Sequence, residues 1–190
     1  MNKPISGSRL QIVLVCLTFI AGTASASEPE QSLSTDGIPN YIDYSETFSS
    51  SGQPPEDYFP LLARLGFEQV IYIALTTNRT AVAQEDVRVL ENGMDYVHVP
   101  VDFSNPSLKN FNTVAAILNG SKGRKTLLYC QANYRASTFS FLYRVIHLGV
   151  PVDVAIQDLH KIWMPNPVWK KFLVDTLAAN GKSYNCETCE

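Results

Sequence analysis

Apolar and polar residues alternate along the chain in two patterns, one with the period of a strand and one with the period of a helix. Short apolar runs predict strands at residues 41–48, 68–75, 94–101 and 124–130. Longer segments with one apolar face, flanked by Pro, Gly or acidic residues, predict helices at residues 54–66, 83–93, 107–120, 135–150, 151–163 and 166–180. Because strands that alternate with helices are joined by crossovers, the pattern predicts an α/β fold. Its central, mostly parallel sheet has about four to five strands, with helices on both faces.

Residues 1–26 have a different pattern from the rest of the chain. Lys3 and Arg9 precede an apolar run at residues 12–21, and the small residues Ala24-Ser25-Ala26 follow it. This order is typical of a secretory signal peptide. The apolar run is short for a bilayer, which disfavours a permanent anchor and any stable membrane insertion after cleavage. The sequence therefore predicts a signal peptide at residues 1–26 and an exported protein, with the periplasm as its compartment.

The remainder of the chain divides into three parts. Residues 27–40 are polar with Gly and Pro and no periodicity, and predict a flexible lead-in. Residues 41–180 carry the alternating pattern and predict one domain, and residues 181–190 form a tail with Cys186 and Cys189. In an oxidising compartment these two cysteines could form a small disulfide, which would leave Cys130 as the unpaired thiol of the mature chain.

Charge and residue types disfavour several classes of function. The formal net charge is −3, and residues 1–26 carry Lys and Arg but no acid, so the mature chain is more acidic still. That balance disfavours a nucleic-acid partner, and an anionic ligand must be bound by local dipoles and one or two cations. No His, Cys and carboxylate cluster has metal-site spacing, so the sequence predicts neither a metal nor another cofactor. His98 lies within a predicted strand and is interpreted as a hydrogen-bonded core residue.

The segment LLYCQANYRAST, residues 127–138, carries the strongest chemical signal. A predicted strand ends at Cys130, and Arg135 opens the next predicted helix after a tight turn. Such a turn directs backbone N–H groups and the positive end of the helix dipole into one concavity, which binds anions and favours a thiolate. A thiolate beside a bound phosphate can attack phosphorus while Arg135 holds two of its oxygens. The simpler alternative is a buried structural cysteine followed by a solvated arginine.

The turn residues themselves are predicted to contact the bound phosphate. They are Gln131, Ala132, Asn133, Tyr134 and Arg135. A loop bent around an anion usually needs one residue with positive φ, and Asn133 tolerates that conformation well.

Three motifs together resemble a known family. Cys-x4-Arg after a strand, SGQPPEDYFPLLARLGFEQVIYI at residues 51–73 and HVPVDFSNP at residues 98–106 are similar to bacterial beta-lactamase-hydrolase-like phosphatases. These form a branch of the cysteine-dependent protein tyrosine and dual-specificity phosphatase superfamily, and the resemblance covers about residues 45–175. It implies a dual-specificity-phosphatase-like fold with Cys130 as the nucleophile, Arg135 as the phosphate clamp and Asp102 as the general acid.

Asp102 and Ser137 each have an argument of their own. Asp102 lies at the end of a predicted strand, on a loop bounded by two prolines, from which a carboxyl group could protonate a leaving oxygen. Its alternative role is to cap the helix that follows. Ser137 keeps the hydroxyl position that assists thiolate release in familiar tyrosine phosphatases. The loop is one residue shorter here, however, because Ala136 occupies their usual arginine position.

The sequence therefore predicts a phosphatase that hydrolyses phosphomonoesters through a cysteinyl-phosphate intermediate. The substrate would be a phosphorylated protein, with a phosphotyrosine-like group, or a phosphorylated small molecule. One alternative is a rhodanese-like sulfurtransferase, which also uses a six-residue loop with a nucleophilic cysteine but needs no Asp102. Another is a phosphate-binding domain with little turnover. In a third, Cys130 is oxidised outside the cytoplasm with Cys186 or Cys189 as its partner, and the activity is redox-gated.

Overall fold

The structure is a computed structural model that describes residue 1 and residues 33–184, of which residues 33–184 belong to one compact unit. The predicted signal peptide after residue 1, the first part of the lead-in (residues 27–32), and the cysteine pair of the tail lie outside the described residues. Their assignments stay predictions.

The described unit contains five strands and six α-helices. The strands are β1 (Ile42–Ser45), β2 (Phe48–Ser51), β3 (Gln69–Tyr72), β4 (Asp95–His98) and β5 (Thr126–Tyr129). The α-helices are α1 (Phe59–Arg64), α2 (Glu85–Glu91), α3 (Leu108–Gly120), α4 (Tyr134–His147), α5 (Val152–Ile162) and α6 (Pro167–Ala179), and a short 3₁₀ turn, η1 (Glu56–Tyr58), precedes α1. None of these helices is long and apolar enough to cross a membrane.

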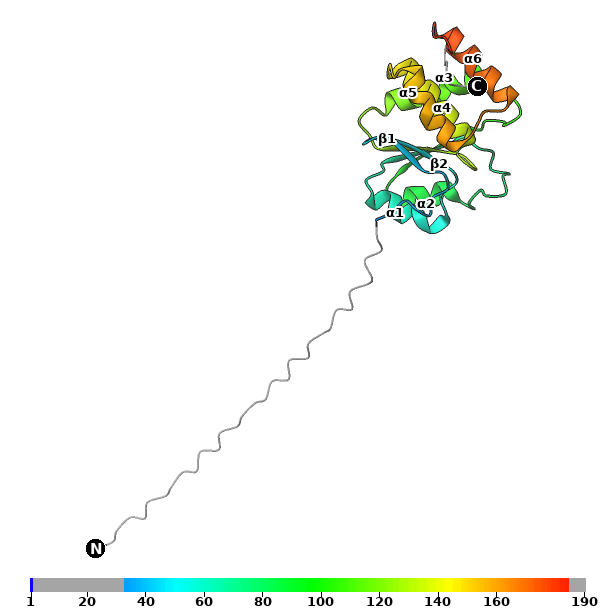
Figure 1. The fold of residues 1–190 in the computed structure, drawn as a ribbon. Helices are drawn as coiled ribbons and strands as arrows, with labels where there is room; N and C mark the ends of the chain where they lie inside the picture. Colours follow the sequence, from blue (N-terminus) through cyan, green and yellow to red (C-terminus); the bar gives the residue numbers. More distant parts are fainter. Residues whose placement is uncertain (2–32, 185–190) are drawn as a thin grey trace. The chain divides into compact units, whose positions relative to one another are not determined.

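The strands form one sheet in the order β1-β2-β5-β3-β4. All neighbours pair in parallel except β1, which pairs antiparallel with β2 at the edge. Helices α1 and α2 cover one face of the sheet, and α3 to α6 cover the other (Figure 1). The predicted α/β fold with a mostly parallel sheet is confirmed. Because β2, β5, β3 and β4 run in the same direction, their carboxyl ends share one edge, which is where ligands bind in such sheets.

The predicted strand at residues 41–48 is in fact a hairpin of β1 and β2. Between the two strands, the Thr47 N–H donates to the Ser45 hydroxyl at 3.3 Å. Strand β2 is buried although three of its four residues are serines. Its serine hydroxyls are satisfied: Ser49 donates to Asp43 at 2.6 Å, and Ser50 pairs with the Tyr44 hydroxyl at 2.8 Å. Because these buried positions hold polar residues, the apolar pattern that predicts strands did not reveal β2.

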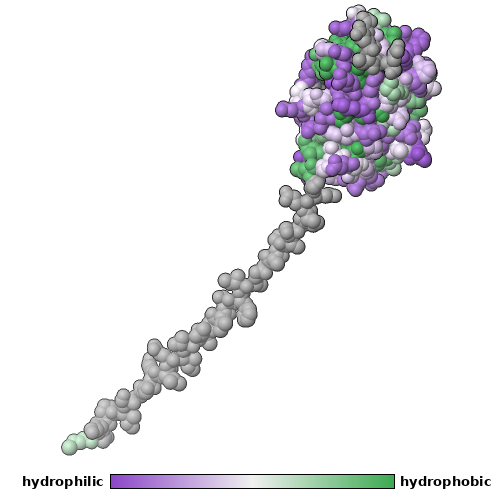
Figure 2. Space-filling model, in the orientation of Figure 1, coloured by the Kyte–Doolittle hydropathy of each residue, from purple (hydrophilic) through white to green (hydrophobic). Residues whose placement is uncertain are grey.

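The core lies on both sides of the sheet and reaches into the lead-in. Helix α4 is buried over most of its length, between the sheet and helices α5 and α6. Ile38, from the end of the lead-in, is also buried in the core. On the face seen in Figure 2, most side chains of the domain are hydrophilic and the apolar ones form separate small patches.

A polar cluster lies between the sheet and α2, below the carboxyl edge. Gln53 and Tyr96 both donate to the buried carboxyl group of Glu85, Tyr96 at 3.2 Å. Nearby, His98 stacks on Tyr72 and its Nε2 bonds to the Ala74 carbonyl at 2.8 Å, which confirms it as a hydrogen-bonded residue. Burial raises the pKa of the Glu85 carboxyl, and the hydrogen bonds to it offset only part of this effect.

Replacing Glu85 with glutamine is expected to flatten the dependence of stability on pH. A carboxyl group whose pKa is raised on folding stabilises the fold fully below its ordinary value of 4.5, and this contribution is lost as pH rises through the raised value. Between pH 4.5 and pH 8 we therefore expect the Tm of Glu85→Gln to fall less than the Tm of the unmodified protein. Thermal unfolding of both proteins at pH 4.5 and pH 8 checks this expectation. An equal change in Tm between the two pH values in both proteins would contradict it.

Candidate active site

Cys130 follows β5 directly and lies at the carboxyl edge of the sheet. Its side chain is buried, and its backbone N–H donates to the Ser51 carbonyl of the neighbouring strand at 3.2 Å. The chain then turns sharply and enters α4 at Tyr134. Asn133, the residue before the helix, has φ of 66°, as the sequence predicts. The turn from Cys130 to Arg135 is called the phosphate loop below.

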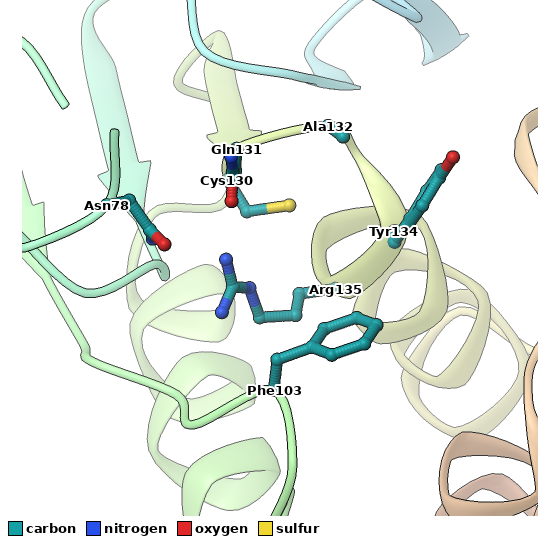
Figure 3. Close-up of a pocket in the computed structure, with 7 residues that line it drawn as sticks. All are labelled: Asn78, Phe103, Cys130, Gln131, Ala132, Tyr134 and Arg135. Atoms are coloured by element: carbon teal, nitrogen blue, oxygen red, sulfur yellow. The ribbon is translucent and has the colours of Figure 1, made fainter. Parts of the chain in front are cut away.

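The phosphate loop forms one side of a pocket of about 360 Å³ (Figure 3). Gln131 and Ala132 lie along the loop, and the guanidinium group of Arg135 lies close to the Cys130 side chain. The residues that line the pocket are Asn78, Phe103, Cys130, Gln131, Ala132, Tyr134 and Arg135.

The backbone of the phosphate loop leaves most of its donors unused. Within the described part of the chain, the N–H groups of Gln131, Ala132 and the first turn of α4 donate to no backbone acceptor, whereas Asn133 adjoins the antiparallel bridge between Gly52 and Ala132. The first helical bond of α4 runs from Ser137 to the Asn133 carbonyl at 2.8 Å. These free donors stand at the N-terminus of a helix of 14 residues. Together with the helix dipole they make a site suited to an anion.

Arg135 supplies the cation of the pocket from the first turn of α4. It is buried, and its Nη1 donates to the Val101 carbonyl at 3.1 Å. The guanidinium carbon lies 5.6 Å from the centre of the Phe103 ring. This bond and this ring contact hold the group in one place, and the remaining guanidinium N–H groups stay available to a ligand.

Asp102 lies on an exposed loop directly before Phe103, which lines the pocket. It is exposed and is not among the residues that line the pocket. Its Oδ1 accepts from the Ser104 N–H at 2.9 Å and from the Ser104 hydroxyl at 2.8 Å. The Ser104 bonds are the main cause of a lowered pKa of the Asp102 carboxyl, and the charge of Arg135 adds to it. The carboxylate form is therefore favoured in this arrangement.

Ser137 also lies outside the pocket lining. Its hydroxyl is in the first turn of α4 and donates to the Tyr134 carbonyl at 3.2 Å, and the side chain is buried. The structure therefore brings Cys130, Gln131, Ala132, Tyr134 and Arg135 together in the pocket lining. Asn133 is fully buried outside that lining, and Asp102 and Ser137 also lie outside it with other hydrogen-bond partners.

Two pocket residues were missed by sequence reasoning. Asn78 follows β3, so its place after a neighbouring parallel strand could have indicated it. Phe103 follows Asp102 in the chain, but its ring contacts Arg135 and Trp169 only through the tertiary fold. Tyr134, at the side of the pocket, stacks on Trp163 with ring centres 4.7 Å apart.

Metal binding has no evident site in the described residues. No group of three or more His, Cys, Asp or Glu side chains within residues 33–184 is placed to hold a metal ion.

Known structures resemble this one in both fold and sequence. No family model matches the chain, and no curated protein matches it in sequence. A candidate phosphatase (DUF442) from Shewanella putrefaciens CN-32 superposes with a TM-score of 0.70 and is 31% identical, over 76% of this chain and 95% of the relative. The chain belongs to the DUF442 family.

The DUF442 assignment confirms the resemblance that the three motifs indicate. More distant structures share the fold alone. The PP-IP phosphatase SIW14 from S. cerevisiae, solved with citrate, has a TM-score of 0.59 and 15% identity over 72% of this chain and 85% of its own. TpbA from P. aeruginosa, solved with phosphotyrosine, has a TM-score of 0.54 and 14% identity over 72% and 90%. This DUF442 chain thus has the fold of cysteine-dependent tyrosine and dual-specificity phosphatases.

Proposed function

We propose that the protein hydrolyses phosphomonoesters through a cysteinyl-phosphate intermediate. The observation that carries this proposal is the pocket in which Cys130, the buried Arg135 and the free N–H groups of the phosphate loop meet. An anion bound there would have its phosphorus beside the thiolate and its oxygens among preorganised donors. Such donors stabilise the charge that develops during phosphoryl transfer.

The reaction proceeds in two steps. In the first, the Cys130 sulfur forms a bond to phosphorus as the ester P–O bond breaks, and the departing oxygen takes a proton from the Asp102 carboxyl. In the second, water attacks phosphorus, gives its proton to Asp102, and the sulfur leaves as a thiolate. Inorganic phosphate is released, and Cys130 and Asp102 return to the thiolate and the protonated carboxyl group with which the reaction began. Ser137 is the proposed donor to the departing thiolate.

The proposed substrates carry the phosphate on a group that contacts the aromatic side of the pocket. The rings of Phe103 and Tyr134 lie beside Arg135 and the phosphate loop, where they would contact the alcohol or phenol part of an ester (Figure 3). Phosphotyrosine, which is bound in the structure of a TpbA variant, and PP-IP, for which the phosphatase SIW14 is named, are therefore suitable first probes. We further propose that the protein works outside the cytoplasm, on the evidence of the pattern at residues 1–26.

Hydrolysis of p-nitrophenyl phosphate by the purified protein in the presence of a reductant tests the proposal. A phosphatase releases p-nitrophenol in each turnover, and rapid acid quenching traps phosphate on Cys130. A sulfurtransferase would instead move sulfur from thiosulfate to cyanide on the same sample. Release of no p-nitrophenol together with tight binding of tungstate would replace the proposal with a phosphate-binding domain.

Ser104→Ala is expected to shift the pH profile of catalysis. General-acid catalysis needs a protonated Asp102, and the Ser104 bonds lower the pKa of that carboxyl. Removing the hydroxyl raises this pKa toward its ordinary value, so the alkaline limb of the kcat profile moves to higher pH.

Asp102→Asn is the matched comparison for Ser104→Ala. Asp102→Asn should remove the alkaline limb of the kcat profile and lower kcat about 10²-fold for an alkyl phosphate, as expected for the loss of a general acid. The decrease should be smaller for p-nitrophenyl phosphate, because its leaving group needs less protonation. Equal losses on the two substrates would exclude Asp102 as the acid.

A further inference from the structure

The phosphate loop is fastened to residues that the sequence pattern assigns to the flexible lead-in. The Asn40 side-chain amide donates to the Ala132 carbonyl at 3.1 Å. In the opposite direction, the Asn133 side-chain amide donates to the Asn40 carbonyl at 2.6 Å. The two asparagines thus form a reciprocal pair of bonds across 93 positions of sequence, called the asparagine clasp below.

Both members of the clasp hold the left-handed backbone conformation. Their φ angles are 49° at Asn40 and 66° at Asn133. Glycine adopts this conformation without steric cost, so backbone geometry alone does not require a side chain at either position. Asn133 even carries a buried Oδ1 with no partner among the described residues. An unpaired buried oxygen is unfavourable, so the contribution of the Asn133 side chain lies in its bond to Asn40.

A second contact holds the loop next to the clasp. The Gln53 N–H donates to the Gln131 carbonyl at 3.2 Å, and Gly52 pairs with Ala132 as an antiparallel bridge. A Cβ atom on Gly52 would lie 3.0 Å from the Pro39 carbonyl and 3.1 Å from the Gln131 carbonyl. The SGQP motif therefore fits tightly between the lead-in and the loop.

These contacts decide which way the loop amides point. In a planar trans peptide the C=O of one residue and the N–H of the next point in opposite directions. The Gln53 bond draws the Gln131 carbonyl to the outside, so the Ala132 N–H faces the other way. In the same manner, the Asn40 bond to the Ala132 carbonyl turns the Asn133 N–H away from the lead-in. Within residues 33–184 the Ala132 N–H donates to no backbone acceptor, and Ala132 lines the pocket, whereas Asn133 is fully buried outside the pocket lining.

We propose that Asn40 is a positioning residue for the phosphate site: by holding the Ala132 carbonyl outside, it fixes the phosphate loop in the shape that presents the Ala132 N–H to the bound oxyanion. This inference rests on the proposed function, since the oxyanion is the phosphate of that reaction. Asn40 touches no reacting atom. The last residues of the lead-in thereby become part of the active-site architecture.

The test compares Asn40→Gly with Gln84→Gly in the full chain under reducing conditions. Gln84 is the matched control, because it is the third non-glycine residue with positive φ in the described part of the chain, at 52°, and lies outside the pocket lining. Both changes keep the backbone conformation, and only the first removes the clasp donor. We measure the tungstate Kd by calorimetry, kcat/KM for p-nitrophenyl phosphate and Tm.

Asn40→Gly is expected to weaken tungstate binding and lower kcat/KM about tenfold, the scale of one lost hydrogen bond. Gln84→Gly should stay within about twofold of the unmodified protein, as substitutions away from the site do. Asn40→Asp, which keeps the size but loses the donor, should lose at least as much and serves as the second variant if Asn40→Gly does not fold. Asn133→Gly added to Asn40→Gly should cost less than the sum of the two, because both act through one clasp.

A tungstate Kd for Asn40→Gly and Asn40→Asp that equals that of Gln84→Gly would overturn the inference, even if their Tm values fall. A purely structural Asn40 would produce that result. Because tungstate binding needs no turnover, a protein that fails to hydrolyse any ester disproves the proposed function while the Kd comparison still decides the role of Asn40.

Discussion

Replacing Cys130 with serine should abolish turnover while leaving the anion site in place. The substitution removes the thiolate but keeps a side chain of nearly the same size in a buried position. For a covalent nucleophile the expected loss in kcat is about 10⁴-fold or more. Tungstate affinity should change less than about tenfold, because the N–H groups and Arg135 that bind the anion are unchanged.

Acid-quenched samples provide the sharper readout for this prediction. The unmodified protein should carry phosphate on Cys130 after brief mixing with substrate, and Cys130→Ser should carry none. A Cys130→Ser protein that retains more than about a hundredth of the original kcat would contradict covalent catalysis by this residue. Loss of tungstate binding together with turnover would show instead that the sulfur shapes the pocket.

Replacing Arg135 with lysine is expected to produce the second largest loss. The guanidinium group is buried and lines the pocket, and one nitrogen is used by the Val101 carbonyl. Its other donors form a planar fork that matches two phosphate oxygens. A lysine keeps the charge but offers a point donor that cannot bond two phosphate oxygens in the same way. We expect kcat to fall about 10²–10³-fold, the range found when one transition-state donor is removed.

Arg124→Lys is the matched control for Arg135→Lys. Arg124 lies before β5, at the other end of the strand from Cys130, and pairs with Asp95 at 2.8 Å on the surface. Steady-state kinetics on p-nitrophenyl phosphate should show little change for this control. A loss of less than tenfold in Arg135→Lys, or equal losses in both variants, would remove Arg135 from the proposed mechanism.

The sequence predicted the fold class because its strongest signals are local. Apolar runs and helical spacing identified β3, β4, β5 and the major helices, because each of these elements shows its pattern within its own short segment. The same local reasoning found Cys130 and Arg135, because a strand, a tight turn and a helix follow one another in a single short segment. The left-handed Asn133 was also predicted, since few residues tolerate that conformation.

What the sequence did not reveal depends on partners far away in the chain. The serines of β2 are polar by type, and only pairing with Asp43 and Tyr44 across the hairpin allows their burial. Phe103 enters the pocket because the fold brings it to Arg135. Asn40 lies in a segment without periodicity, and its bond to the phosphate loop exists only after the sheet has assembled.

The phosphate loop contains no glycine between Cys130 and Arg135, although Asn133 adopts a glycine-like conformation. Glycine loses the most backbone freedom when a chain is ordered, so a loop without it has fewer alternative shapes to give up. Little conformational entropy is then left to lose when an anion binds, and more of the contact energy appears as affinity. In the proposed reaction, a loop of this composition serves as a rigid receptor for phosphate, whose shape is set during folding.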